Sequence, residues 1–227
     1  MNSSVITFPG SNCDRDMDVA LKKFGFKNKM VWHDDIELPK SDLVVLPGGF
    51  SYGDYLRCGS MASKSKIMKS VINFANSGGK VMGICNGFQI LVEAGLLPGA
   101  LLRNEYLDFI CKNVFVKINN KDNTYFRNIK KDTFEFHIAH NEGNYFCSNE
   151  QLKEISNNNQ IALFYSDKSG SITKENNPNG SVKNIAAIFN KEKNILGMMP
   201  HPERMIDSAL SGEDGSIFFE NLINNLK

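Results

Sequence analysis

Cys85 has the surroundings of a nucleophile. It stands in GICNGFQIL (residues 83–91), between Gly83 and Gly87, where an apolar run gives way to a helical pattern. G-x-C-x-G in that place is the thiol form of a nucleophile elbow, a sharp turn that strains the backbone and needs glycine so that neighbouring chain can pass. A helix starting near Asn86 would also present free N–H groups that favour a thiolate. The motif predicts a cysteine that attacks carbonyl carbon; the alternative is an inert, buried small side chain.

A thiolate that makes and breaks an acyl bond needs a general acid/base, usually a histidine, and the chain has four. His33 follows a strand pattern, and we expect it to be solvated or structural. His137 and His140 stand near the end of another strand pattern, where a core role, contact with substrate and simple exposure are all compatible with the sequence.

His201 has the most informative context, GMMPHPERM (residues 197–205). Pro200 and Pro202 fix φ on either side of it and disfavour helix, so we expect an extended segment. Residues two apart in an extended segment point the same way, which would set the Glu203 carboxylate beside the imidazole. The sequence thus predicts a Cys85–His201–Glu203 set, and the competing interpretation of H-P-E is a surface turn with an incidental ion pair.

A pair of glycines completes this candidate site. The run VVLPGG places Gly48 and Gly49 at the carboxyl end of a strand, where open α/β sheets form their binding crevices. A backbone N–H from Gly49, together with that of Asn86, would make a two-donor hole for an oxyanion. The alternative for these glycines is a plain tight turn.

The elements that must position these residues alternate in the first half of the chain. Strand patterns at 3–8, 29–33, 42–49 and 80–84 are interleaved with helical patterns at 13–26, 65–79 and 86–95. Such alternation predicts crossover connections and an open, mostly parallel twisted sheet with helices on both faces, an α/β fold.

The second half of the chain has a different texture. β-type runs at 108–120, 133–146, 160–166, 184–190 and 194–201 precede an amphipathic helix at 215–226. We expect these runs to add strands, some of them antiparallel, to the same sheet or to a small appended one. The polar tracts at 119–131, 149–160 and 168–183 are predicted to be solvated loops.

Bulk composition is that of an ordinary globular protein. With 227 residues, 41% hydrophobic, 22% charged and a net charge of +1, the chain predicts one domain, 1–227, without a bias toward nucleic acid or membrane. No signal peptide or membrane span is recognisable, which predicts a cytoplasmic protein. The five cysteines are odd in number and lack a C-x-x-C pair, so we expect reduced thiols and no metal site.

Several longer motifs point to one family. FPGSNCDRD, PGGFSYGDYLRCG, GICNGFQIL, AGLLPGALLRN, AHNEGNY and GMMPHPERM follow one another nearly throughout the chain. This series resembles the glutamine amidotransferase subunits of the small-subunit form of phosphoribosylformylglycinamidine synthase, within the class I (triad) amidotransferases. The resemblance implies a flavodoxin-like fold and a glutaminase that supplies ammonia for purine synthesis. Asn141 is a departure, since glycine is expected there.

The resemblance also implies roles for individual residues. Cys85 would be the nucleophile, His201 the acid/base and Glu203 its orienting partner, and Gly49 and Asn86 would be oxyanion donors. The implied substrate contacts with L-glutamine are Gln89, Arg103, His140 and Glu142.

Partners are implied as well. A large synthetase subunit would use ATP and magnesium to convert formylglycinamide ribonucleotide to formylglycinamidine ribonucleotide, and a third, very small subunit would join the complex. This chain shows no P-loop and is expected to need no cofactor of its own. Residues 53–59 and 140–145 are expected to flank the crevice mouth and are candidates for the docking surface.

Two other functions stay open at this point. One is a related cysteine hydrolase or deglycase, but such enzymes usually carry histidine directly after the cysteine, where this chain has Asn86. The other is a catalytically silent regulatory binding module. The presence of all three triad residue types argues against this second alternative.

Overall fold

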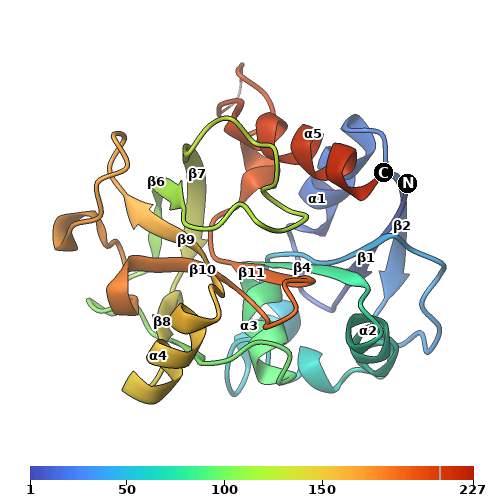
Figure 1. The fold of residues 1–227 in the computed structure, drawn as a ribbon. Helices are drawn as coiled ribbons and strands as arrows, with labels where there is room; N and C mark the ends of the chain where they lie inside the picture. Colours follow the sequence, from blue (N-terminus) through green and yellow to red (C-terminus); the bar gives the residue numbers. More distant parts are fainter. Residues whose placement is uncertain (210) are drawn as a thin grey trace.

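A nine-stranded sheet runs through the computed structural model, which describes residues 1–209 and 211–227 (Figure 1). The strand order is β2-β1-β3-β4-β11-β10-β9-β6-β7. The strands are β1 (Asn2–Thr7), β2 (Lys27–Trp32), β3 (Leu43–Leu46), β4 (Lys80–Ile84), β6 (Ile110–Ile118), β7 (Thr133–His140), β9 (Ile161–Ser166), β10 (Ile185–Phe189) and β11 (Ile195–Met198). β5 (Ala100–Leu102) and β8 (Asn144–Phe146) form a separate antiparallel pair.

The first half of the chain builds the parallel part of the sheet. β1 pairs in parallel with β2 and β3, β3 with β4, and β4 with β11. Figure 1 shows α1 (Asp14–Lys23) and α5 (Asp214–Leu226) over one face, and α2 (Lys66–Asn76) and α3 (Asn86–Glu93) over the other. The order β2-β1-β3-β4-β11 is the flavodoxin-like arrangement. The predicted α/β fold is confirmed.

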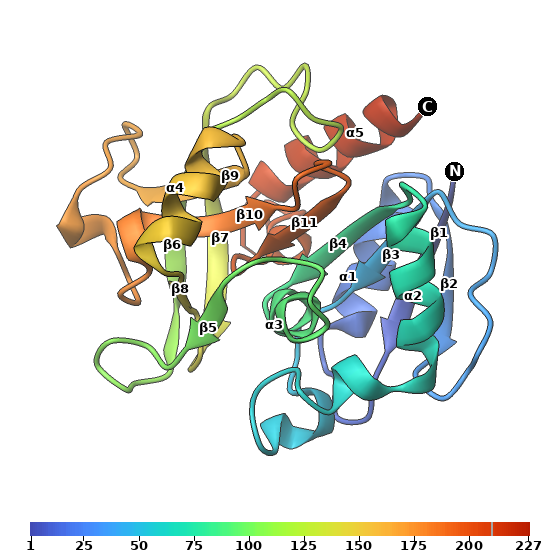
Figure 2. The same ribbon diagram turned by 60° about the horizontal axis from the view of Figure 1, so that its bottom comes forward.

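The second half adds the antiparallel strands, as expected. β10 pairs antiparallel with β11 and β9, and β6 pairs antiparallel with β9 and β7. Figure 2 shows these strands to one side of β11 and the parallel strands to the other. The parallel and antiparallel parts of the sheet meet near the carboxyl end of β4. There the backbone N–H of Cys85 donates to the Met198 carbonyl at 2.7 Å, and His201, which follows β11, forms an isolated bridge with His137 of β7.

The prediction of a solvated loop at 149–160 was wrong. Asn149–Asn157 form helix α4, which a capping box starts: the Ser148 side chain accepts from the Gln151 N–H, and the Gln151 side chain accepts from the Ser148 N–H. Only Ile155 of this helix is buried, so its polar residues do face solvent.

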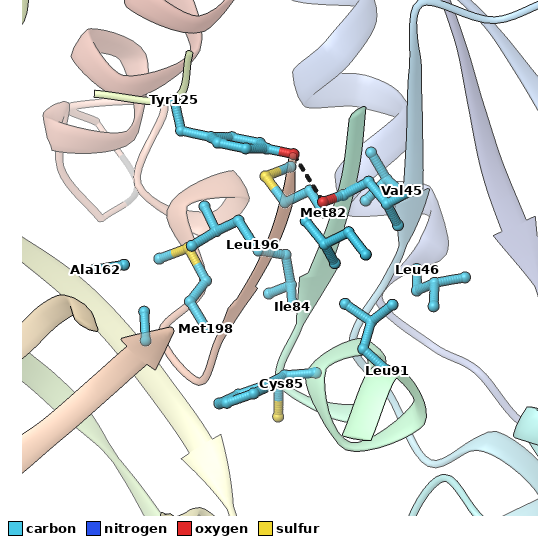
Figure 3. Packing of buried hydrophobic residues seen from close by; sticks show 14 of the residues in the cluster. Val45, Leu46, Met82, Ile84, Cys85, Leu91, Tyr125, Ala162, Leu196 and Met198 are labelled. Carbon is cyan, nitrogen blue, oxygen red and sulfur yellow. Dashed lines mark hydrogen bonds between the residues drawn. The ribbon is translucent and has the colours of Figure 1, made fainter. Parts of the chain in front are cut away.

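Residues 119–131 were also misjudged as merely solvated. Tyr125, Phe126 and Ile129 are buried, and the single hydroxyl proton of Tyr125 is shared between the carbonyl oxygens of Val81 and Asn194, each 2.8 Å from the hydroxyl oxygen. Figure 3 shows the Tyr125 ring reaching across the core to β4. The segment therefore contacts β4 and the residue before β11, the two strands that lead into Cys85 and the His201 segment.

The core extends across both halves of the sheet. The buried hydrophobic side chains form one cluster that includes Val5 of β1, Met82 of β4 and Phe136 of β7. This continuity supports the proposal that residues 1–227 form one domain. None of the helices that the structure describes is long and apolar enough to cross a membrane.

Candidate active site

Cys85 occupies a strained turn between β4 and α3. Its φ of 49° and ψ of −105° lie outside the usual regions for a non-glycine residue, as an elbow requires. A Cβ on Gly83 would come within 2.6 Å of the Gly87 carbonyl oxygen, and a Cβ on Gly87 would overlap the carbonyl of Leu46. Both glycines are thus needed for close backbone approach. Figure 3 shows the sulfur pointing away from the packed core side chains.

His201 and Glu203 make the predicted contact. His201 Nδ1 lies 2.6 Å from Glu203 Oε1, and both residues are almost fully buried. The reason given from the sequence was wrong, however, because Pro202–Arg204 form a short 3₁₀ turn rather than an extended segment. Proline is compatible with the first residue of such a turn, since it has no N–H to leave unpaired.

The surroundings of the His201 ring favour its charged form. Burial alone would lower the pKa of His201, but the Glu203 carboxylate and the Cys85 sulfur outweigh it and raise the pKa. His201 Nε2 has no hydrogen-bond partner among the described residues. The Cys85 thiol is 3.7 Å from the carbonyl oxygen of Ala139. The ring nitrogen on the side away from Glu203 is therefore free to exchange a proton.

Gly48 and Gly49 follow the end of β3 and lie next to the site. A Cβ on Gly48 would stand 2.6 Å from His201 Cε1, so the absence of a side chain makes room for the ring. Gly49 has a φ of +121°, and a Cβ there would meet the Asn12 nitrogen at 2.5 Å. Asn86 is the first residue of α3, where a backbone N–H has no intrahelical acceptor. These positions are compatible with the proposed oxyanion donors.

A cavity of about 570 Å³ opens beside the sulfur. Its lining includes these residues proposed from the sequence: Cys85, His201, Gly49, Gln89, Arg103, His140 and Glu142. Two proposed site residues, Glu203 and Asn86, are not among the lining residues. Glu203 contacts His201 Nδ1, and Asn86 is the first residue of α3. The chain thus brings residues from five separate motifs to one pocket.

The residues proposed to contact substrate are held in place by a buried polar network. The Gln89 amide nitrogen donates to the Glu142 carbonyl at 2.6 Å, and its oxygen accepts from the Asn86 side chain at 2.9 Å. Asn104, which the sequence did not single out, is buried; its amide nitrogen donates to the carbonyls of Asp108 and His140. The network fixes the segment that carries His140 and Glu142.

Asn104 also fixes the tautomer of His140. Because its nitrogen is committed to two carbonyls, its Oδ1 is the atom that faces His140 Nδ1, at 3.1 Å, and Nδ1 must be the donor. His140 Nε2 is then a bare acceptor, buried and without a partner among the described residues. Burial, with the nearby His201, lowers the pKa of His140 to about 4, so the ring is neutral at pH 7.

The low pKa of His140 gives a testable pH dependence of stability. In the unfolded chain a histidine takes up a proton near pH 6.5, whereas folded His140 does not until about pH 4. Stability from this group is therefore present above pH 6.5 and is lost as the pH falls toward 4. Urea unfolding should show a free energy about 2 kcal/mol lower at pH 5 than at pH 7 from this residue alone. His140→Leu should remove this contribution to the pH dependence. An equal change in the free energy of unfolding between pH 7 and pH 5 in the two proteins would contradict the prediction.

One further pocket residue, Arg204, was not singled out from the sequence. The Arg204 guanidinium donates to the Cys13 sulfur at 3.0 Å and lies 3.4 Å from Asp16, which ties the His201–Arg204 turn to α1. Arg204 directly follows Glu203, so its place in the same motif could have indicated it. Asn141, where glycine was expected, has no left-handed φ, and its carbonyl accepts from the Asn104 N–H at 2.9 Å; the side chain needs no strained backbone.

The pocket's other buried thiols are poor nucleophiles. Burial raises the pKa of Cys13 to about 12 and raises that of Cys58 as well, so both stay protonated at pH 7. Within residues 1–209 and 211–227, no group of three or more His, Cys, Asp or Glu side chains is placed to hold a metal ion.

Comparisons with known proteins agree with this site. Residues 1–212 match the model of the CobB/CobQ-like glutamine amidotransferase domain. The chain is 83% identical to phosphoribosylformylglycinamidine synthase subunit PurQ of Pelagibacter ubique over the whole of both chains, and 47% identical to that of Chlorobaculum parvum, covering 100% of this chain and 90% of the other. In the structure of PurLQS from Thermotoga maritima, a chain of 40% identity superposes with a TM-score of 0.87 over 100% of this chain and 99% of that one.

Fold, pocket and family match define the class: this chain is a glutamine amidotransferase. It belongs to the family of PurQ subunits of phosphoribosylformylglycinamidine synthase, whose glutaminase role is in purine biosynthesis. The family match supports this function over the two alternatives left open by the sequence, a deglycase-like hydrolase and a silent binding module.

Proposed function

We propose that this chain hydrolyses L-glutamine through a thioester on Cys85 and passes the ammonia to a synthetase partner. The observation that carries the proposal is that the strained Cys85 turn lines the same pocket as His201, whose Nδ1 lies 2.6 Å from the buried Glu203 Oε1. Glutamate release from glutamine, measured for the chain with and without its partner, tests the proposal. Release that requires neither the partner nor Cys85 would contradict it.

The chemistry follows from the proton positions. The thiol proton of Cys85 passes to His201 Nε2, and Glu203 stabilises the imidazolium that forms. The thiolate attacks the side-chain amide carbon, and the N–H groups of Gly49 and Asn86 bind the oxyanion. His201 then protonates the leaving nitrogen, ammonia departs, and water activated by the same ring hydrolyses the thioester to glutamate.

The far wall of the pocket suits an amino acid. His140 Nε2 and the Glu142 carboxylate are acceptors, and they match an α-ammonium group, which has only donors. Arg103 lines the same pocket and matches the α-carboxylate. The Gln89 side chain is held by the Asn86 side chain and by the Glu142 carbonyl, and it would set how deeply the side-chain amide of substrate glutamine enters the pocket.

The protonation of ammonia in water is the reason why partner subunits are needed. In water at neutral pH it becomes ammonium, which is not nucleophilic, so it must reach its acceptor inside a complex. The similar chain of known structure is part of PurLQS, and we propose that this chain likewise joins a large synthetase subunit and a third, very small one. The synthetase would supply the ATP and magnesium sites and convert formylglycinamide ribonucleotide to formylglycinamidine ribonucleotide. This chain would need no cofactor.

His140 gives a prediction specific to substrate binding. His140→Leu removes the Nε2 acceptor, while Asn104 Oδ1 keeps the Gly143 N–H as a partner. Loss of a hydrogen bond to a charged group should raise KM for glutamine roughly tenfold and leave kcat nearly unchanged. Steady-state kinetics of the reconstituted complex measures both. The control is His33→Leu, because His33 contacts Tyr52 and is not among the pocket-lining residues; a fall in kcat at constant KM would contradict the assignment.

A further inference from the structure

A second cysteine–histidine pair lies beside the pocket proposed to bind glutamine, and its cysteine is one of the residues that line the pocket. The Cys111 sulfur lies 3.5 Å from His137 Nε2, and His137 Nδ1 lies 3.1 Å from Asn113 Oδ1. The antiparallel register of β6 and β7 sets Asn113 directly opposite His137, and Cys111, two residues away, falls on the same face. The strands therefore hold a Cys–His–Asn arrangement, the residue types that papain-like enzymes use.

The hydrogen bonds fix which ring nitrogen faces the thiol. The Asn113 amide nitrogen donates to Glu135 Oε1 at 3.2 Å, so its Oδ1 accepts and His137 Nδ1 carries the proton. His137 Nε2 is then unprotonated, and its lone pair faces the Cys111 sulfur. Burial, with the Arg204 guanidinium and His201, lowers the pKa of His137, which keeps the ring neutral and able to accept the thiol proton.

Cys111 differs from the other thiols in access. It is the only exposed cysteine of the described residues, whereas Cys13, Cys58, Cys85 and Cys147 are buried. It also lines the cavity that holds Cys85. A group attached to Cys111 would therefore occupy part of the cavity proposed to bind glutamine.

We propose that Cys111 is a thiol-modification site that reacts with low-molecular-weight disulfides and, once modified, blocks the glutamine pocket. The Cys111 sulfur attacks one sulfur of the disulfide, the reagent's S–S bond breaks and a new S–S bond to Cys111 forms. Cys111 is oxidised to a mixed disulfide, and half of the reagent is reduced to a thiol. The proton of Cys111 passes to His137 Nε2 and from there to the departing thiolate.

Oxidised glutathione, added to the full chain without reductant, tests the reactivity. A Cys85→Ala background removes the catalytic sulfur, and mass spectrometry with peptide mapping follows the adduct. One glutathione should appear on Cys111, and His137→Gln should slow its formation roughly tenfold. His33→Gln is the matched control and should leave the rate unchanged. Labelling mainly at Cys13, Cys58 or Cys147, or an equal rate in His137→Gln with the same thermal unfolding midpoint, would overturn the proposal.

Activity of the assembled complex tests the blocking step. The wild-type complex should lose glutaminase activity in proportion to the Cys111 adduct and regain it with dithiothreitol. Cys111→Ser should keep its activity under the same treatment. Equal inhibition of Cys111→Ser, or an adduct that leaves activity intact, would show that Cys111 does not control entry. The labelling experiment needs no turnover, so its outcome is independent of the proposed glutaminase function.

Discussion

Cys85→Ala is expected to lower kcat for glutamine hydrolysis by about 10⁶-fold, the loss typical of an enzyme deprived of its nucleophile. Alanine keeps the packing at the elbow but has no atom that can carry the acyl group. Affinity for glutamine should persist, because the proposed substrate contacts lie on other residues. Single-turnover glutamate release by the complex, with glutamine binding measured by calorimetry, separates the two effects.

The matched control for this change is Cys147→Ala. Cys147 is also buried, but it is not among the residues that line the pocket. It should leave kcat within a factor of about two, because only packing is altered. An active Cys85→Ala protein, or an equal loss in both variants, would show that the cysteine at the elbow is structural.

Glu203→Gln is expected to lower kcat by about 10⁴-fold, by analogy with the amide substitution in a serine protease triad. The carboxylate holds His201 Nδ1–H at 2.6 Å and raises the pKa of the ring. An amide can turn its NH₂ toward Nδ1 and select the wrong tautomer, and it removes the charge that stabilises the imidazolium. The pKa of His201 should fall, because a charge that raises it is removed.

Stability should fall together with activity in Glu203→Gln. The Glu203 carboxylate raises the pKa of the buried His201 ring, so the pair stabilises the folded state at pH 7, and removing the charge should lower the free energy of unfolding. Glu93→Gln is the control, since this carboxylate pairs with Arg57. A catalytic loss below tenfold with an unchanged pH profile would rule out Glu203 as the orienting residue. Steady-state rates and urea unfolding of the same preparations give both quantities.

The sequence predicted the parts of the fold whose patterns are strong and local. The alternating strands and helices before Gly99 carry clear periodicity, and the parallel sheet follows from them. Helix α4 was missed although Ser148 and Gln151 have the spacing of a capping box, because the asparagine-rich tract suggested a loop. The buried side chains of Tyr125 and Phe126 could not be predicted, since their partners are distant in sequence.

The candidate site was predicted best where a residue lies in a motif. Cys85 and His201 were assigned from their neighbours, and the structure brings both to the same pocket. The 3₁₀ turn at Pro202–Arg204 shows that the right contact can be predicted for the wrong reason. Asn104 ends the motif AGLLPGALLRN, but its role is visible only in its hydrogen bonds, because nothing in the sequence separates it from the chain's many other asparagines.

Acid quenching of the assembled complex during turnover of isotopically labelled glutamine tests the central claim most directly. Peptide mapping of the trapped protein should find one labelled glutamyl group, held as a thioester on Cys85 and released by hydroxylamine. Label on Cys13, Cys58, Cys111 or Cys147, or glutamate formation with no covalent label at any time in the pre-steady state, would contradict a mechanism in which Cys85 is the nucleophile.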